Sequence, residues 1–246
     1  MVGRFVDCHS HVVPSGDDGA QTLAEGAQLC ALAHASGTEI LYATPHVRPG
    51  QLLDLEREAA IEAAFEELAR DAPLELRLGY ELTPAPELLE EDPARYVLDR
   101  TNVVLVEVPF TGPADGFLEL AEHVEAAGLV PLVAHPERTE AVQTHASFAE
   151  ELAERGWPLQ VNSTSLVGRH GAEATAIGWR LVEDGHAKIV ASDGHRLTRP
   201  ARIDDAYELA RDRVGEEAAL PLFTGEALRL EINARPTPSR AGARDA

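Results

Sequence analysis

The sequence is poor in cysteine, in positive charge and in long apolar runs, and each shortage excludes a class of protein. Two cysteines among 246 residues are too few for a disulfide framework or a cysteine-rich zinc module. The 21 basic residues against 42 acidic ones leave a formal net charge of −21, which repels nucleic-acid phosphates and anionic lipids. No segment approaches the roughly 20 apolar residues of a membrane span, and the first residues contain no secretion signal. We therefore expect a cytoplasmic protein that binds neither nucleic acid nor membrane.

Short apolar stretches alternate with amphipathic segments along the chain, which is the pattern of repeated βα units. We predict strands at residues 4–7, 39–43, 74–79, 102–106, 129–134, 158–161 and 188–191. A first helix is capped by Thr22 and ends at Gly37, and its inner face is predicted to carry Leu23, Ala27, Cys30, Ala31 and His34. Further helices are predicted at 52–70, 115–127, 147–155, 172–183 and 203–214. The composition suits one domain over residues 1–233, with a disordered tail at 234–246.

Every predicted strand is followed by a side chain that can bind a metal or take part in polar chemistry. In chain order these are His9 and His11, His46, Glu81, Glu107, His135, Asn162, and Asp193 with His195. They recur at intervals of roughly 30 residues, the length of a βα repeat. In a closed parallel β/α barrel the carboxyl ends of all strands face one mouth, where the active sites of this architecture lie. We therefore expect these distant residues to converge.

The types of residue indicate a metal centre. Five histidines and several carboxylates cannot stay unpaired in a cleft, because packed acids repel and desolvated charges are costly. Mixed imidazole and carboxylate ligands suit zinc, manganese or iron(II) better than magnesium or calcium. In the segment Asp7 to His11, alternation along an extended chain places both histidines on one face. The remaining histidines, His34, His123, His145, His170 and His186, are expected to have structural or surface roles.

The motifs DCHSHVVPSGDDG, ATPH, GYEL, VEVP, AHPER, QVNSTSLVG and ASDGH occur in this order between Asp7 and His195. They resemble the PHP (polymerase and histidinol phosphatase) superfamily, and within it the bacterial metal-dependent protein-tyrosine phosphatases associated with capsular or exopolysaccharide synthesis. The resemblance implies an α/β fold, a distorted (β/α)7 TIM-like barrel, as a single PHP phosphatase domain. It also implies three divalent metal ions, manganese foremost, with iron or zinc as alternatives.

The resemblance also implies roles for individual residues. One ion would be held by His9, His11, Glu81 and Asp193, a second by the bridging Glu81 with Glu107 and His135, and the third by Asp18, His46 and His195. Asp18 is preferred to Asp17 because it matches the second aspartate of the DDG motif. Arg138 of the HPER motif would bind the phosphoryl group. Arg199 is the candidate for a second phosphate-binding arginine, with Arg196 nearby as the alternative.

The implied activity is hydrolysis of phosphotyrosine on a protein by a metal-bridged hydroxide, the partner being a bacterial tyrosine kinase of polysaccharide synthesis. The first alternative is a small-molecule phosphatase of the histidinol-phosphate type. A nuclease is disfavoured by the charge, and a non-catalytic regulatory or binding module by the complete set of ligands. A cysteine phosphatase needs Cys-x5-Arg, but Pro14 lies six residues after Cys8 and Ser36 six after Cys30. The oligomeric state is left open.

Overall fold

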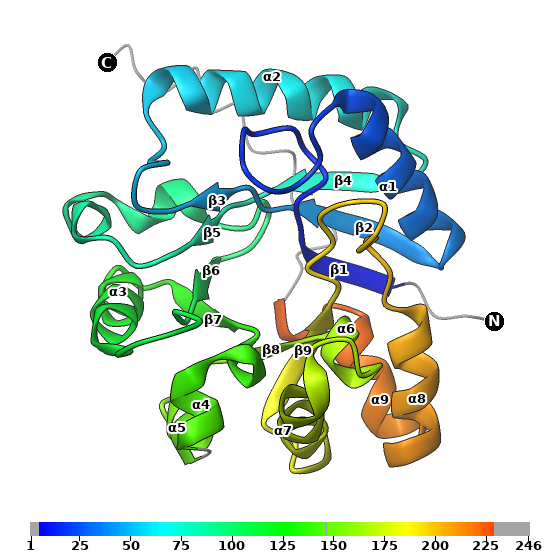
Figure 1. Cartoon of the computed structure of the whole chain (residues 1–246). Helices are drawn as coiled ribbons and strands as arrows, with labels where there is room; N and C mark the ends of the chain where they lie inside the picture. Colours follow the sequence, from blue (N-terminus) through cyan, green and yellow to red (C-terminus); the bar gives the residue numbers. More distant parts are fainter. Residues whose placement is uncertain (1–4, 146, 229–246) are drawn as a thin grey trace.

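The fold is built from two parallel sheets in a computed structural model that describes residues 5–145 and 147–228. The smaller sheet has the order β1 (Phe5–Ser10), β2 (Thr38–Ala43), β4 (Glu75–Leu78) (Figure 1). The larger sheet has the order β3 (His46–Val47), β5 (Glu81–Leu82), β6 (Val103–Glu107), β7 (Val130–Ala134), β8 (Leu159–Asn162), β9 (Ala187–Ala191). The expected α/β class is confirmed. The predicted tail, residues 234–246, lies outside the described residues.

The two sheets are joined by backbone hydrogen bonds. Two residues separate β2 from β3, and two separate β4 from β5. Across these breaks the Gly79 N–H donates to the Ala43 carbonyl at 2.9 Å, and the Glu81 N–H to the Pro45 carbonyl at 3.2 Å. Pro45 has no N–H to give to a sheet, and Gly79 lies so close to Leu98 that a Cβ would meet its Cδ2 at 2.4 Å. The seven predicted strands are therefore seven runs of chain, of which two are interrupted.

A second connection lies between the first strand and the last. The His11 N–H donates to the Gly194 carbonyl at 2.7 Å, and the Asp193 N–H to the His9 carbonyl at 2.9 Å. The chain leaving β9 thus pairs with the end of β1. These bonds bring together potential metal ligands that lie more than 180 positions apart in the sequence.

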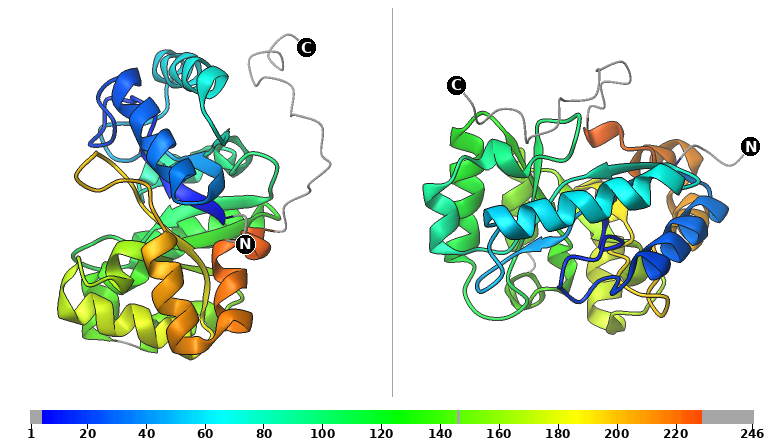
Figure 2. Two further views of the ribbon diagram at one scale, coloured as in Figure 1. Left: turned by 90° about the vertical axis from the view of Figure 1, so that its right-hand side faces the viewer. Right: turned by 90° about the horizontal axis from the view of Figure 1, so that it is seen from above.

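Helices lie on the outside of the strands (Figure 2). The α-helices are α1 (Leu23–Ala35), α2 (Leu55–Asp71), α3 (Asp115–Ala126), α4 (Glu140–Thr144), α5 (Ser147–Glu154), α6 (Ser163–Leu166), α7 (Gly171–Glu183), α8 (Asp204–Val214) and α9 (Glu216–Phe223). Short 3₁₀ turns are η1 (Pro86–Glu90), η2 (Pro93–Tyr96), η3 (Pro136–Arg138) and η4 (Glu226–Leu228). Among the described residues, no helix combines the length and apolarity needed to span a membrane. The longer helices begin and end within a few residues of their predicted positions.

The predicted inner face of α1 is confirmed only in part: Cys30 is buried and Leu23 packs against the core. Thr22 caps the helix as expected, accepting from the Glu25 N–H at 3.2 Å, but Ala27, Ala31 and His34 are exposed. The buried positions are Gly26, Leu29, Cys30 and Ala33. A Cβ on Gly26 would lie 2.3 Å from the Val12 carbonyl oxygen, so this glycine lets the helix approach the chain that leaves β1. The close contact between Gly26 and the Val12 backbone thus fixes which side of the helix is buried, and this side differs in part from the predicted apolar face.

The strands are buried on both faces, as expected where helices cover one face and other strands the other. In β6, Val104 and Val106 belong to the large apolar cluster that includes the helix residue Phe117. Val103 and Leu105 belong to a second cluster to which β1, β2, β7 and β9 also contribute. A cluster that takes side chains from five strands holds those strands around a common centre, and their carboxyl ends are thereby kept together.

Candidate metal centre

Most of the metal-ligand candidates lie near the carboxyl ends of the seven strand runs. His9 lies within β1, His46 and Glu81 begin the short strands β3 and β5, and Glu107 ends β6. His11, His135, Asp193 and His195 lie in the segments that directly follow β1, β7 and β9, and Asp18 lies in the loop before α1. The structure brings all of them together. All are buried except Asp18, whose side chain is 61% exposed.

Glu81 lies at the centre of the cluster. Its Oε2 atom is 3.2 Å from His9 Nε2, 3.3 Å from His11 Nε2 and 3.0 Å from His46 Nδ1. Its Oε1 atom is 3.1 Å from His135 Nε2. Burial alone would raise the pKa of Glu81, but the surrounding imidazoles hold it well below its ordinary value. The carboxylate therefore stays charged and faces four histidines at once.

Asp193 connects the histidine cluster to an arginine. Its Oδ1 atom is 3.5 Å from His9 Nε2 and 3.4 Å from His11 Nε2. Its Oδ2 atom accepts hydrogen bonds from Arg138 Nη1 at 2.6 Å and from Asn162 Nδ2 at 3.0 Å. Asp193 thus has Oδ1 toward the histidines and Oδ2 toward Arg138 and Asn162.

His135 and Asp193 adopt strained backbone conformations. Their φ angles are 33° and 50°, and in the described part of the chain only Arg100 joins them as a non-glycine residue with positive φ. Left-handed backbone at such residues is costly and is found preferentially at functional sites, where the surrounding structure enforces it. The strain turns these two side chains back into the cluster directly after β7 and β9.

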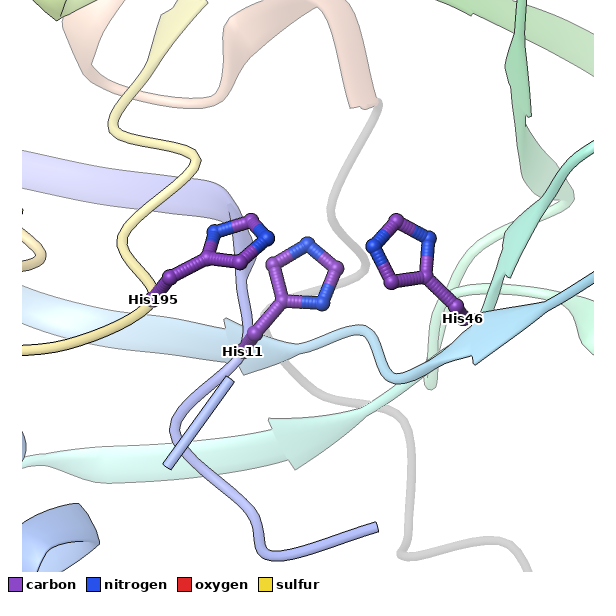
Figure 3. Close-up of side chains that lie close together, drawn as sticks. All are labelled: His11, His46 and His195. Atoms are coloured by element: carbon purple, nitrogen blue, oxygen red, sulfur yellow. The ribbon is translucent and has the colours of Figure 1, made fainter. Parts of the chain in front are cut away.

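Three of the imidazoles, those of His11, His46 and His195, point toward one another, from the segments after β1 and β9 and from the start of β3 (Figure 3). The ring centroid of His11 lies 3.9 Å from that of His195 and 4.4 Å from that of His46. Asp18 borders this group, with Oδ1 3.4 Å from His46 Nε2 and Oδ2 3.6 Å from His195 Nε2. Asp17 is buried, accepts the backbone N–H groups of Gly19 at 2.9 Å and His46 at 3.2 Å, and has its Oδ2 atom 3.8 Å from His11 Nδ1. Asp18 thus approaches two of these three imidazoles, and Asp17 approaches one.

Hydrogen bonds on the outer nitrogens orient two of the histidines. His9 Nδ1–H donates to Gln160 Oε1 at 3.0 Å, and Gln160 Nε2 donates to Asn162 Oδ1 at 2.8 Å. His195 Nδ1–H donates to the Asp193 carbonyl at 2.9 Å. In both rings the Nε2 lone pair then faces the cluster, which is how metal-binding histidines are usually fixed. Gln160 was missed by sequence reasoning, although it shares a strand face with Asn162.

The donors fit divalent cations. Buried His11 Nδ1, His46 Nδ1, Glu81 Oε2 and His135 Nδ1 have no hydrogen-bond partner, although Glu81 Oε2 has three imidazole nitrogens close by. Burial, together with the charges of Glu81 and Asp193, raises the pKa of Glu107 to about 8. Among the residues that the structure describes, four groups of three side chains have their ligand atoms within 4.8 Å of one another. A site with so many ligand atoms that lack hydrogen-bond partners, and with crowded carboxylates, is stabilised by bound cations. Mixed nitrogen and oxygen ligands suit transition metals.

The two arginine candidates differ in where they point. Arg199 Nη2 lies 3.8 Å from Asp193 Oδ1, whereas Arg196 Nε donates to Glu25 Oε1 on α1 at 2.6 Å. Arg138 and Arg199 therefore both approach Asp193, and Arg196 does not. This geometry supports the choice of Arg199 as the second phosphate-binding candidate.

Phe110 was also missed, because an apolar residue three positions after Glu107 carries no chemical signal in the sequence. Its ring lies 5.4 Å from that of His135 with planes 7° apart, and Arg138 Cζ lies 4.7 Å from its centroid. An aromatic ring thus borders the cluster beside the guanidinium of Arg138.

Glu137 is a buried carboxylate next to the cluster that sequence reasoning did not single out. Its Oε1 atom accepts from the Asn162 N–H at 3.1 Å and from Ser165 Oγ at 2.7 Å. Burial raises its pKa to about 7. Ser165 Oγ also lies 3.1 Å from His170 Nδ1. Glu137 ties the end of β8 and helix α6 to η3, the turn that carries Arg138.

The chain is similar in sequence to a known protein family and to several of its members. The family model "Capsular polysaccharide synthesis, CpsB/CapC" matches residues 5–230. The tyrosine-protein phosphatase YwqE of Bacillus subtilis is 30% identical over 232 residues, which cover 92% of this chain and 91% of the relative. The tyrosine-protein phosphatase CpsB of Streptococcus agalactiae is 27% identical, over 91% of this chain and 96% of the relative.

A solved structure extends the similarity to the arrangement of the chain. It comes from work on YwqE of Bacillus subtilis and CpsB of Streptococcus pneumoniae, described as unique metal-dependent tyrosine phosphatases. It matches with a TM-score of 0.79 and 29% sequence identity, covering 88% of this chain and 90% of the solved one. The match to the family model, over residues 5–230, spans all the strands that carry the cluster.

Proposed function

The chain belongs to the CpsB/CapC family of capsular polysaccharide synthesis, and on that basis we propose that it is a metal-dependent phosphatase that hydrolyses phosphotyrosine on a protein. One observation carries the proposal: Arg138 and Arg199 both approach Asp193, which also contacts the histidine cluster. Guanidinium groups recognise phosphoryl oxygens, and cations beside them are suited to phosphoryl transfer. Relatives named tyrosine-protein phosphatases support the choice of substrate.

We propose three divalent ions, manganese foremost, with iron or zinc as alternatives. His9, His11, Glu81 and Asp193 would hold one, Glu81 with Glu107 and His135 the second, and Asp18, His46 and His195 the third. Such ions, when bound, supply Lewis acidity toward phosphoryl oxygens and activate a water molecule. The unsatisfied donors of the cluster support this assignment.

The chain's own residues have three tasks in this proposal. Arg138, fixed by Asp193 and by the Phe110 ring, binds phosphoryl oxygens without having to reorganise, which is where electrostatic stabilisation is most effective. Arg199 adds a second positive charge. Gln160 and the Asp193 carbonyl keep His9 and His195 in the tautomer that leaves Nε2 free.

We propose that the seven strand runs form a distorted (β/α)7 barrel, the PHP fold, in a single domain over residues 1–233. The bonds that join β2–β3 to β4–β5 and β1 to the end of β9 support closure, as does the apolar cluster shared by five strands. A cytoplasmic location, with a bacterial tyrosine kinase as the phosphorylated partner, belongs to the same proposal.

The proposal is tested by assaying the purified, manganese-loaded protein on a phosphotyrosine peptide, histidinol phosphate and single-stranded DNA. We expect the peptide to be hydrolysed, and His135→Ala and Arg138→Ala to lose most of that activity. Arg155→Ala is a matched control, because Arg155 also lies over an aromatic ring, that of Trp157, and pairs with Glu122 far from the cluster.

The outcomes separate the alternatives. Absence of metal-dependent hydrolysis of every phosphomonoester would overturn the enzymatic assignment in favour of a non-catalytic module. Preference for histidinol phosphate would overturn only the substrate, and cleavage of DNA would replace the phosphatase by a nuclease.

A further inference from the structure

Phe110 is an exposed aromatic side chain at the edge of the metal centre. Its side chain is 42% exposed, and it is the one aromatic among the five large apolar residues exposed in the described chain. It lies in the loop between β6 and α3, three residues after Glu107. The residues after it, Thr111 to Pro113, are exposed as well. The ring is therefore accessible to a molecule that enters the centre from solvent.

The ring is held in place from several directions. It lies nearly parallel to the His135 imidazole, at 5.4 Å and 7°, and beneath the Arg138 guanidinium at 4.7 Å. The Phe110 carbonyl accepts the Glu140 N–H at 2.9 Å, and Glu140 Oε2 accepts the Gly112 N–H at 3.0 Å. A loop tied to α4 by both bonds presents the ring in one orientation before any ligand arrives, which lowers the entropy cost of binding.

The position of the ring matters because of what Arg138 does. In the proposed function Arg138 binds the phosphoryl group, and its guanidinium already lies against Phe110. In an aryl phosphate the ring is separated from phosphorus by one oxygen. A phosphoryl group bound at Arg138 therefore carries its aryl ring into the neighbourhood of Phe110, where offset or edge-to-face packing of two rings is favourable.

We infer that Phe110 is a specificity-determining residue that favours aryl over alkyl phosphate esters by packing against the ring of the leaving phenol. The inference rests on the proposed function and deepens it, because it gives a physical reason for phosphotyrosine in preference to phosphoserine or an aliphatic metabolite. Another exposed apolar side chain, Leu197, lies two residues after His195 and is 45% exposed, so apolar surface occurs at a second point near the centre.

The test measures binding, so that it does not depend on turnover. Phenylphosphonate and cyclohexylphosphonate, which are similar in size but differ in aromaticity, are titrated calorimetrically into the manganese-loaded protein. In Phe110→Leu the preference for the phenyl ligand should fall about fivefold, the usual worth of one aromatic pair. Phe110→Tyr keeps a ring and should keep the preference. Leu209→Ala, which alters an exposed apolar residue on α8, is the matched control and should change nothing.

Two results would overturn the inference: an unchanged preference in Phe110→Leu, whether or not both ligands weaken equally, or no preference in the wild type. Equal weakening would mean that Phe110 serves only to hold Arg138. Failure of the proposed function would look different, since the wild type would then bind the phosphonates yet hydrolyse no phosphomonoester.

Discussion

Loading the centre with divalent ions at neutral pH should release protons, and for Glu107 the number can be worked out. Burial, with the negative charges of Glu81 and Asp193, raises its pKa to about 8. With that pKa, Glu107 carries about 0.9 proton at pH 7 and about 0.2 proton at pH 8.5. A carboxylate must be deprotonated to bind a metal. Its contribution to proton release should therefore fall from about 0.9 to about 0.2 between these pH values.

Other groups release protons too, so Glu107→Gln is needed to isolate this contribution. His11 is one of them, because Asp17, Asp193 and Glu81 raise its pKa well above the ordinary value in spite of its burial. Subtracting the number of protons released by Glu107→Gln from the number released by the wild type cancels the contribution of groups that both proteins share. Glu119→Gln, which alters an exposed glutamate on α3, is the control and should match the wild type.

The measurement is calorimetric titration of manganese in two buffers of different ionisation enthalpy, at pH 7 and at pH 8.5. The apparent enthalpy changes with the buffer in proportion to the protons released. A difference between wild type and Glu107→Gln that is near zero at pH 7, or that does not decline at pH 8.5, would refute the reasoning. Either result would mean that Glu107 is not a crowded, protonated carboxyl that a cation converts to a ligand.

Three further predictions concern residues around the centre. Arg199→Ala should lower kcat/KM for a phosphotyrosine peptide about 30- to 100-fold, as loss of a charged hydrogen bond does, whereas Arg196→Ala should change it less than twofold. Equal effects in steady-state assays would contradict the geometry. Burial raises the pKa of both Cys8 and Cys30, so iodoacetamide should leave the folded enzyme active while a chelator inactivates it; inactivation by alkylation would contradict a thiol-independent reaction. Burial raises the pKa of Glu137 from 4.5 to about 7, so its stabilising effect is complete below pH 4.5 and is lost as the pH rises through 7. Between pH 4.5 and pH 8, the free energy of unfolding of the wild type, measured with urea, should fall by about 3 kcal/mol more than that of Glu137→Gln. An equal change with pH in the two proteins would exclude this account.

Much of the fold and of the metal centre could be predicted from local sequence. The seven strand runs and the longer helices are found near their predicted positions because a βα repeat leaves a periodic apolar pattern of its own. The convergence of His9, Glu81, His135 and Asp193 also follows from the sequence, because parallel strands in such a repeat place their carboxyl ends at one edge. Each of these inferences needs only the position of a residue within its own repeat.

The tertiary structure decided what depends on contacts between repeats. Local pattern places only part of the buried face of α1 correctly, because the close approach of Gly26 to Val12 is invisible within the helix. The sequence favours Arg199 but leaves Arg196 open as the alternative; the structure places Arg199 beside Asp193 and Arg196 beside Glu25. Glu137, Gln160 and Phe110 gain their roles from partners on other elements. The sequence by itself determined which chemical groups meet at the strand ends, whereas packing between distant segments determined how each group is oriented, because the direction of a side chain is set by its neighbours in space.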